Sequence, residues 1–283
     1  MKKILLSLCA LLLLVGCTDA HAKLKDANTA LITVGDTTIT KGDIYSSMIQ
    51  QGSGYVALST ATQAILEKEV PITDEITAEA TKSLETYKAT YGDSLEAALQ
   101  SYGYKDVDDF YNNSLVLSAQ LTELTKKYVN ENFDALVTKY EPRQATVLTF
   151  GTEEDAKNAK AELESGVDAM TVASNFNSSS AGSPRIITTD TDLDVSVKSF
   201  IQNATAPGIS DVLIGTDVEN FYIVNVNEID PNNIKEDVIT VFANMASTAT
   251  DSDKFYFQKY GFKIYDRELY DNIKTNYPDY LFN

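Results

Sequence analysis

The chain has 283 residues and is strongly acidic, with 41 Asp and Glu against 23 Lys and Arg and a formal charge of −18. This balance argues against binding to nucleic acids, whose phosphate backbone is recognised by basic surfaces. The single histidine, His21, leaves no imidazole for a serine-protease triad or a His-rich zinc site unless that residue supplies it. Because 43% of the residues are hydrophobic, the chain can bury a substantial core in two domains or one large one.

The N-terminus predicts a signal peptide over residues 1–16. Lys2 and Lys3 precede an apolar run over residues 4–15, which is too short to span a bilayer and has the length of a signal-peptide core. The run ends in the letters LVGC, which match a bacterial lipobox. An ordinary secretory signal with a chance cysteine is the alternative. We expect Cys17 to be the mature N-terminus and to carry the acyl chains that attach the protein to a membrane.

Residues 17–28 are polar and without periodicity, and we expect them to form a lipidated tether that includes His21. Removal of residues 1–16 leaves 21 basic against 41 acidic residues, a charge of −20. Cys9 is lost with the signal peptide, so the mature chain has no pair of cysteines for a disulfide. The folded body must therefore be held together by its core alone.

Residues 29–140 are predicted to form an N-terminal helical segment. It opens with two short strands joined at Gly35-Asp36, and Thr40 with Asp43 forms a capping box for the next helix. Helices are expected over residues 56–70 and 74–90, followed by two short helical units and one longer helix. The longer helix carries an amphipathic stripe that we interpret as core or as the wall of a groove for apolar client segments. The stripe consists of Leu117, Leu121, Leu124 and Tyr128.

Residues 141–230 change in character and predict a separate module bounded by prolines at 142 and 231. The expected order is a strand at 145–150, helices at 152–166 and 167–176, a β-like stretch at 185–189, a helix at 195–204 and a strand at 221–226. This is a βααβαβ module.

Residues 231–283 are predicted to be helical again, with an acidic break at 248–253 and ten aromatic residues between Phe255 and Phe282. So aromatic a tail must pack on another surface, and the N-terminal helices are the available one. The pattern leaves open whether this tail lines a client cleft or a dimer interface. The predicted fold class is α+β, with a mainly helical body formed by both ends of the chain and the βααβαβ module inserted.

These features together resemble the PrsA foldase lipoproteins of Gram-positive bacteria and, more distantly, the SurA-type chaperones. The resemblance rests on the lipobox, on VGDTTITKGDIY, on the βααβαβ module, which is parvulin-like, and on the returning segment FKIYDRELYD. It implies a foldase anchored at the extracellular face of the cell membrane. It also implies unfolded secreted polypeptides as partners, a helical chaperone body, possible homodimers and no cofactor.

The resemblance also implies a peptidyl-prolyl isomerase site in the parvulin-like module. The family has a histidine in the first strand, a Cys or Asp after the second helix, a Met or Leu followed by a Phe in the third helix, and a histidine in the last strand. These positions fall on Thr146, Ser178, Ser196, Phe200 and Tyr222.

Only the phenylalanine position keeps the family's residue type, and both histidines are replaced. We therefore expect a degenerate isomerase site, and chaperone action without efficient isomerisation. The alternative is an active isomerase in which the hydroxyl groups of Thr146, Ser178 and Tyr222 preserve a polar network.

Two further readings receive less support. Asp190, Asp192 and Asp194 resemble the start of a calcium loop, but Val195 and Ile201 stand where an EF-hand needs Gly and Glu. We expect a solvated loop with helix-capping acids and no metal. A solute-binding or adhesive lipoprotein is disfavoured by the absence of Trp and of two similar α/β lobes.

Overall fold

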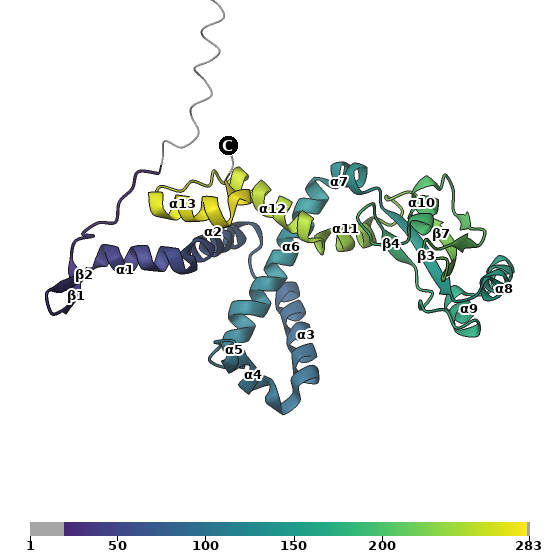
Figure 1. Ribbon diagram of the computed structural model, residues 1–283, viewed down its shortest axis with the longest axis horizontal. Coiled ribbons are helices and arrows are strands. Elements are labelled where there is room, and N and C mark those ends of the chain that lie inside the picture. The colour runs from purple at the N-terminus through teal and green to yellow at the C-terminus, as the bar shows by residue number, and fades with distance from the viewer. Residues whose placement is uncertain (1–19, 282–283) are drawn as a thin grey trace, which may run out of the picture. The chain divides into compact units, whose positions relative to one another are not determined.

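The computed structural model describes residues 20–281, so the predicted signal peptide and the lipid-attachment residue Cys17 lie outside the described residues. The chain divides into two compact units (Figure 1). Unit 1 contains the described residues up to Thr125 and those from Ala249 onward, and unit 2 runs from Lys126 to Thr248. The α+β fold class is confirmed, because long helices dominate and a single five-stranded sheet lies in unit 2.

Unit 1 begins with the expected hairpin and helices. The Thr40 side chain accepts from the Asp43 backbone N–H, and the Asp43 carboxylate accepts from the Thr40 backbone N–H at 2.8 Å, which confirms the capping box. Thr73 caps a second long helix as expected. The elements are β1 (Ala30–Val34), β2 (Thr37–Thr40), α1 (Lys41–Met48), a π-helical turn (Ile49–Ser53), α2 (Gly54–Glu69), α3 (Asp74–Tyr91), a 3-10 turn (Gly92–Ser94), α4 (Leu95–Ser101), α5 (Val107–Phe110), a second π-helical turn (Tyr111–Leu115), α6 (Val116–Glu131), α12 (Ala246–Lys259), α13 (Arg267–Asn276) and a last 3-10 turn (Pro278–Tyr280). The end of α6 and the start of α12 belong to unit 2.

The C-terminal helices pack on the N-terminal helices within unit 1, as the ribbon shows for α13 and α2 (Figure 1). The carboxylate of Glu69, whose side chain is only 6% exposed, lies 2.6 Å from the ammonium of Lys259 and accepts a hydrogen bond from the Tyr260 hydroxyl. The Asn272 amide donates to the carbonyl of Ile49 at 2.8 Å. Polar contacts between residues at least 190 positions apart therefore close this unit.

Two details near the ends of the chain differ from the sequence predictions. The run at 248–253 does not break a helix, because Thr248 and Ser252 lie one turn apart and both are buried within the continuous α12. The predicted tether is docked rather than free from residue 20 onward. Ala20 is buried, and the backbone N–H of Ala22 donates to the carbonyl of Tyr265 at 2.8 Å. Backbone pairing with a segment distant in the sequence replaced the disorder expected from polar composition.

Unit 2 is built on an antiparallel sheet in the order β4-β3-β7-β5, with β6 also paired to β7. The predicted order of elements is confirmed, with two additional strands of two residues each. The elements are α7 (Phe133–Tyr140), β3 (Arg143–Phe150), α8 (Glu153–Glu164), α9 (Ala169–Asn175), β4 (Arg185–Ile187), α10 (Val195–Asn203), β5 (Gly208–Ile209), β6 (Leu213–Ile214), β7 (Phe221–Glu228) and α11 (Lys235–Ala243).

The two faces of this sheet carry separate cores because side chains alternate along each strand. Leu148, Phe150 and Ile223 pack with residues of α8 and α9 on one face. Val147 and Val224 pack with residues of α10 on the other. Alternate residues of each strand therefore contact either α8 and α9 or α10.

The boundaries of unit 2 lie outside the predicted 141–230. Buried side chains of α7 and α11 form a third core with the C-terminal part of α6, and the rings of Tyr140 and Phe242 lie 5.4 Å apart. Residues 231–248 therefore belong to the unit with the sheet rather than to the helical body. The reason is that the apolar face of α11, which includes Val238, finds its partner on α7 and not on the N-terminal helices.

Candidate functional site

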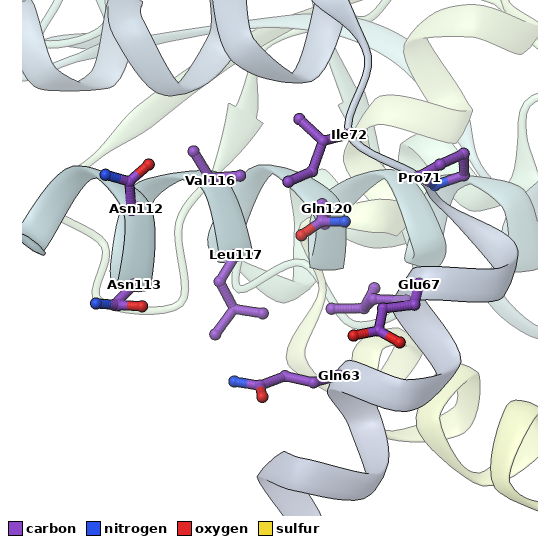
Figure 2. A pocket seen from close by; sticks show the side chains of 10 residues that line it. Gln63, Glu67, Pro71, Ile72, Asn112, Asn113, Val116, Leu117 and Gln120 are labelled. Atoms are coloured by element: carbon purple, nitrogen blue, oxygen red, sulfur yellow. The ribbon is translucent and has the colours of Figure 1, made fainter.

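Unit 1 contains a groove of about 470 Å³ between α2, the α2–α3 connection and the start of α6 (Figure 2). Its apolar floor includes Leu117, one member of the stripe that the sequence singled out. Gln120 ties the walls together, because its amide nitrogen donates to the carbonyl of Val70 at 2.7 Å. The groove is lined by Gln63, Leu66, Glu67, Pro71, Ile72, Asn112, Asn113, Val116, Leu117 and Gln120.

The polar side chains of this groove provide hydrogen-bond acceptors as well as amide donors. The side-chain nitrogens of Asn112 and Asn113 donate to the Asp108 carbonyl and the Asp109 carboxylate, at 2.8 and 2.6 Å. Each of these amides keeps its carbonyl oxygen and a second N–H hydrogen for a ligand. With the carboxylate of Glu67, the groove combines apolar surface with acceptors and lacks a cationic side chain in its lining. It suits apolar segments that bring their own N–H donors.

The five predicted isomerase positions do not converge on one point in unit 2. Thr146 lies on the face of β3 that meets α8 and α9, and its hydroxyl donates to the Asn227 side-chain oxygen at 3.2 Å. It lines a pocket of about 320 Å³ with Asn225 and Met170. Tyr222 lies on the opposite face of the sheet, where its register partner on β3 is Thr149. The two positions predicted to replace the family histidines are therefore separated by the sheet.

The other positions gather around α10 and the adjoining edge of β3. Phe200 and Tyr222 are half-buried and pack on the same core below α10. Ser178 lies in the loop after α9, where its hydroxyl accepts from the backbone N–H of Thr149 at 3.1 Å. Ser196 lies in the first turn of α10. Ser196, Phe200 and Tyr222 therefore share the side of the sheet that α10 covers, here called the α10 face. Thr146 lines the pocket on the opposite side, and Ser178 is held at the backbone of β3.

Asp194 organises this face, and its place in the site was not predicted beyond a capping role. One carboxylate oxygen accepts from the backbone N–H and the hydroxyl of Ser196, at 2.8 and 2.6 Å. The other accepts from the backbone N–H and the hydroxyl of Thr216, both at 2.8 Å. These donors, first the Ser196 hydroxyl and then the Thr216 N–H, hold the pKa of Asp194 far below its usual range. Asp194 thus joins the start of α10 to the loop before β7.

Burial raises the pKa of Tyr222, and the charges of Asp194 and Asp217 raise it further. The phenol therefore stays protonated at neutral pH and can donate a hydrogen bond. Alternation along the two strands, which can be counted in the sequence, predicts that Thr149 lies on the same face as Tyr222. The loop that contains Thr216 has no sequence pattern that predicts its contact with Asp194.

The α10 face contains hydroxyls, carboxylates and Phe200 but no imidazole. Its Asp194 carboxylate already accepts four hydrogen bonds. Among residues 20–281 there is also no group of three or more His, Cys, Asp or Glu placed to hold a metal. Chemically, the face can donate and accept hydrogen bonds around a small apolar group.

Part of the sequence is similar to that of a named protein. No protein-family model matches the chain. Foldase protein PrsA 2 of Bacillus cereus is 27% identical over 164 residues, which cover 58% of this chain and 54% of that protein. The chain resembles a PrsA-type foldase. It spans about half the length of the PrsA relative that it matches.

Solved PrsA structures also match. The foldase PrsA of Streptococcus pneumoniae is 20% identical with a TM-score of 0.46, and the match covers 88% of this chain and all of that one. The peptidylprolyl isomerase PrsA of B. cereus is 17% identical with a TM-score of 0.45, and the match covers 88% of this chain and 98% of that one.

Proposed function

We propose that this protein is a lipid-anchored extracytoplasmic chaperone of the PrsA type, which holds apolar segments of secreted polypeptides while they fold. The groove of unit 1 is the single observation that carries the proposal. It pairs an apolar floor with hydrogen-bond acceptors on its walls, which is the complement of an extended, unfolded segment with exposed backbone N–H groups. The sequence similarity to a foldase supports the same role.

The parvulin-like module contributes weakly or not at all to isomerisation in this proposal. Rotation about an X-Pro bond faces a barrier of about 18–20 kcal/mol. A catalyst must place polar groups around the twisting amide, next to a slot for the proline ring. Here Thr146 and Tyr222 lie on opposite sides of the sheet, and neither is an imidazole.

Attachment at the outer face of the cell membrane is assigned to acyl chains on Cys17. None of the helices between residues 20 and 281 is long and apolar enough to cross a bilayer. The lipobox is what supports attachment, and two or three acyl chains on one cysteine would anchor the chain stably.

The test is suppression of aggregation of an unfolded model protein by residues 18–283. Ile72→Asp is the informative variant, since Ile72 lines the groove and is 63% exposed, so that a charge there changes the groove without disturbing a core. Ile214→Asp is the matched control, because Ile214 is 53% exposed but lies in unit 2.

We expect the parent and the control to suppress aggregation equally, and Ile72→Asp to need several-fold more protein for the same effect. Equal loss of aggregation suppression in Ile72→Asp and Ile214→Asp would show that the groove is not the binding surface. No suppression by the parent chain would reject the chaperone role.

A further inference from the structure

The first described residues limit the distance that the chain can put between Cys17 and unit 1. Ala20 is buried, and the backbone of Ala22 pairs with Tyr265 and Asp266. An extended chain spans at most about 3.6 Å per residue, so Cys17 lies no more than about 11 Å from Ala20. A membrane attached at Cys17 is thus held close to the part of unit 1 on which Ala20 is docked.

The elements that follow this docked segment expose apolar side chains. Leu31, Ile32 and Val34 of the hairpin are 53%, 49% and 67% exposed, and Ile44 and Met48 of α1 are 39% and 58% exposed. Strands β1 and β2 pair only with each other within the described chain. A two-stranded sheet of this kind is marginally stable in water, so its apolar side chains would gain from a further contact.

The charge of this region differs from that of the rest of the protein. Residues 20–48 contain three Lys and three Asp, a net charge of 0, whereas residues 49–283 contain 18 basic and 37 acidic residues, a net charge of −19. The Lys41 ammonium donates to the carbonyl of Lys25 at 3.0 Å, so two of the lysines lie at the base of the hairpin. Lysines beside apolar side chains suit the headgroup region, while the rest of the body would be repelled by anionic lipids.

We propose that the β1–β2 hairpin inserts its apolar side chains into the surface of the bilayer to which Cys17 attaches the chain. The occupant of this apolar surface is the lipid interface. The inference rests on the proposed function, because it takes the anchor at Cys17 as the first contact. Two contacts would hold unit 1 in one orientation at the membrane rather than on a swinging tether.

The chain contains no Trp, which allows a direct test with a single introduced fluorophore. Val34→Trp reports on the hairpin, and Leu31→Trp is a second probe in case the first disturbs strand pairing. Tyr102→Trp is the matched control, because Tyr102 is 77% exposed in unit 1 but lies after α4. Cys17 is the only cysteine of residues 17–283, so it can be coupled to a maleimide phospholipid. Each protein is then measured on phosphatidylcholine vesicles with and without brominated acyl chains.

We expect the hairpin probes to shift to shorter wavelength on vesicles and to be quenched several-fold by the brominated chains, while the control stays unchanged. Solvent-like emission from both hairpin probes on vesicles would overturn the inference. A shift that develops without vesicles as protein concentration rises would also overturn it, because a second copy would then cover the hairpin.

Failure of the anchor itself gives a different result. Coupling to the synthetic lipid does not depend on the cell's own acylation, so the hairpin is tested in either case. The mass of the mature N-terminus from cells tests the anchor separately, and an unmodified Cys17 would reject the anchoring proposal without changing the fluorescence result.

Discussion

Asp194 is expected to stabilise unit 2 by joining two segments with one carboxylate. Asp194→Ala removes the N-cap of α10 and both hydrogen bonds to Thr216. Loss of such a cap costs about 1 kcal/mol, and we assign about 1 kcal/mol more to the Thr216 contacts, at the low end for a charged acceptor because Asp194 is partly exposed. The sum of about 2 kcal/mol corresponds to a Tm lower by roughly 8 °C for a unit of this size.

The matched control is Asp192→Ala, which removes the same charge two residues away from an exposed position. Thermal unfolding of residues 18–283 followed by circular dichroism should show a lower Tm for Asp194→Ala and little change for the control. Asp194→Asn keeps one acceptor oxygen and should fall between them. Equal Tm values for Asp194→Ala and Asp192→Ala would refute the reasoning.

The pH dependence of this difference has a definite sign. The pKa of Asp194 is lowered in the folded state, so its contribution is complete above the unfolded pKa of about 3.9 and is lost as pH falls through the folded value. The difference between Asp194→Ala and the parent should therefore be the same at pH 7 and pH 5 and shrink below about pH 4. A difference that already disappears at pH 5 would contradict the assignment.

Three further outcomes are expected. In a proline-peptide isomerisation assay, residues 18–283 should give little rate enhancement, and robust acceleration would show that the hydroxyls of the α10 face are sufficient. Phe242→Ala should lower the stability of unit 2 by about 3–5 kcal/mol in urea unfolding because Phe242 is fully buried against Tyr140, and a loss below 1 kcal/mol would contradict the placement of α11. Tyr280→Phe removes the hydrogen bond to Asp253, whose pKa burial already raises, so it should destabilise unit 1 at neutral pH and less at acid pH, where the carboxyl is protonated. A loss independent of pH would instead indicate a packing effect.

Local patterns in the sequence were sufficient for most elements of this fold. The Gly35 turn, the Thr40 capping box and the Thr73 cap are set by neighbouring residues, because a hairpin turn or a cap needs only three or four positions. The α+β class and the resemblance to PrsA also followed from the order of such elements.

Contacts between distant residues decided the remainder. Side-chain alternation along the paired strands β3 and β7 places Thr146 and Tyr222 on opposite faces of the sheet. The register of the two strands depends on pairing between residues about 75 positions apart, which no local sequence pattern predicts. The placement of α11, the docking of Ala22 on Tyr265 and the joining of Ser196 to Thr216 by Asp194 have the same origin. By itself, the sequence determined which elements form and that imidazole is missing from the module. Only the tertiary structure decided which side chains share a face, because burial and register are properties of the assembled chain.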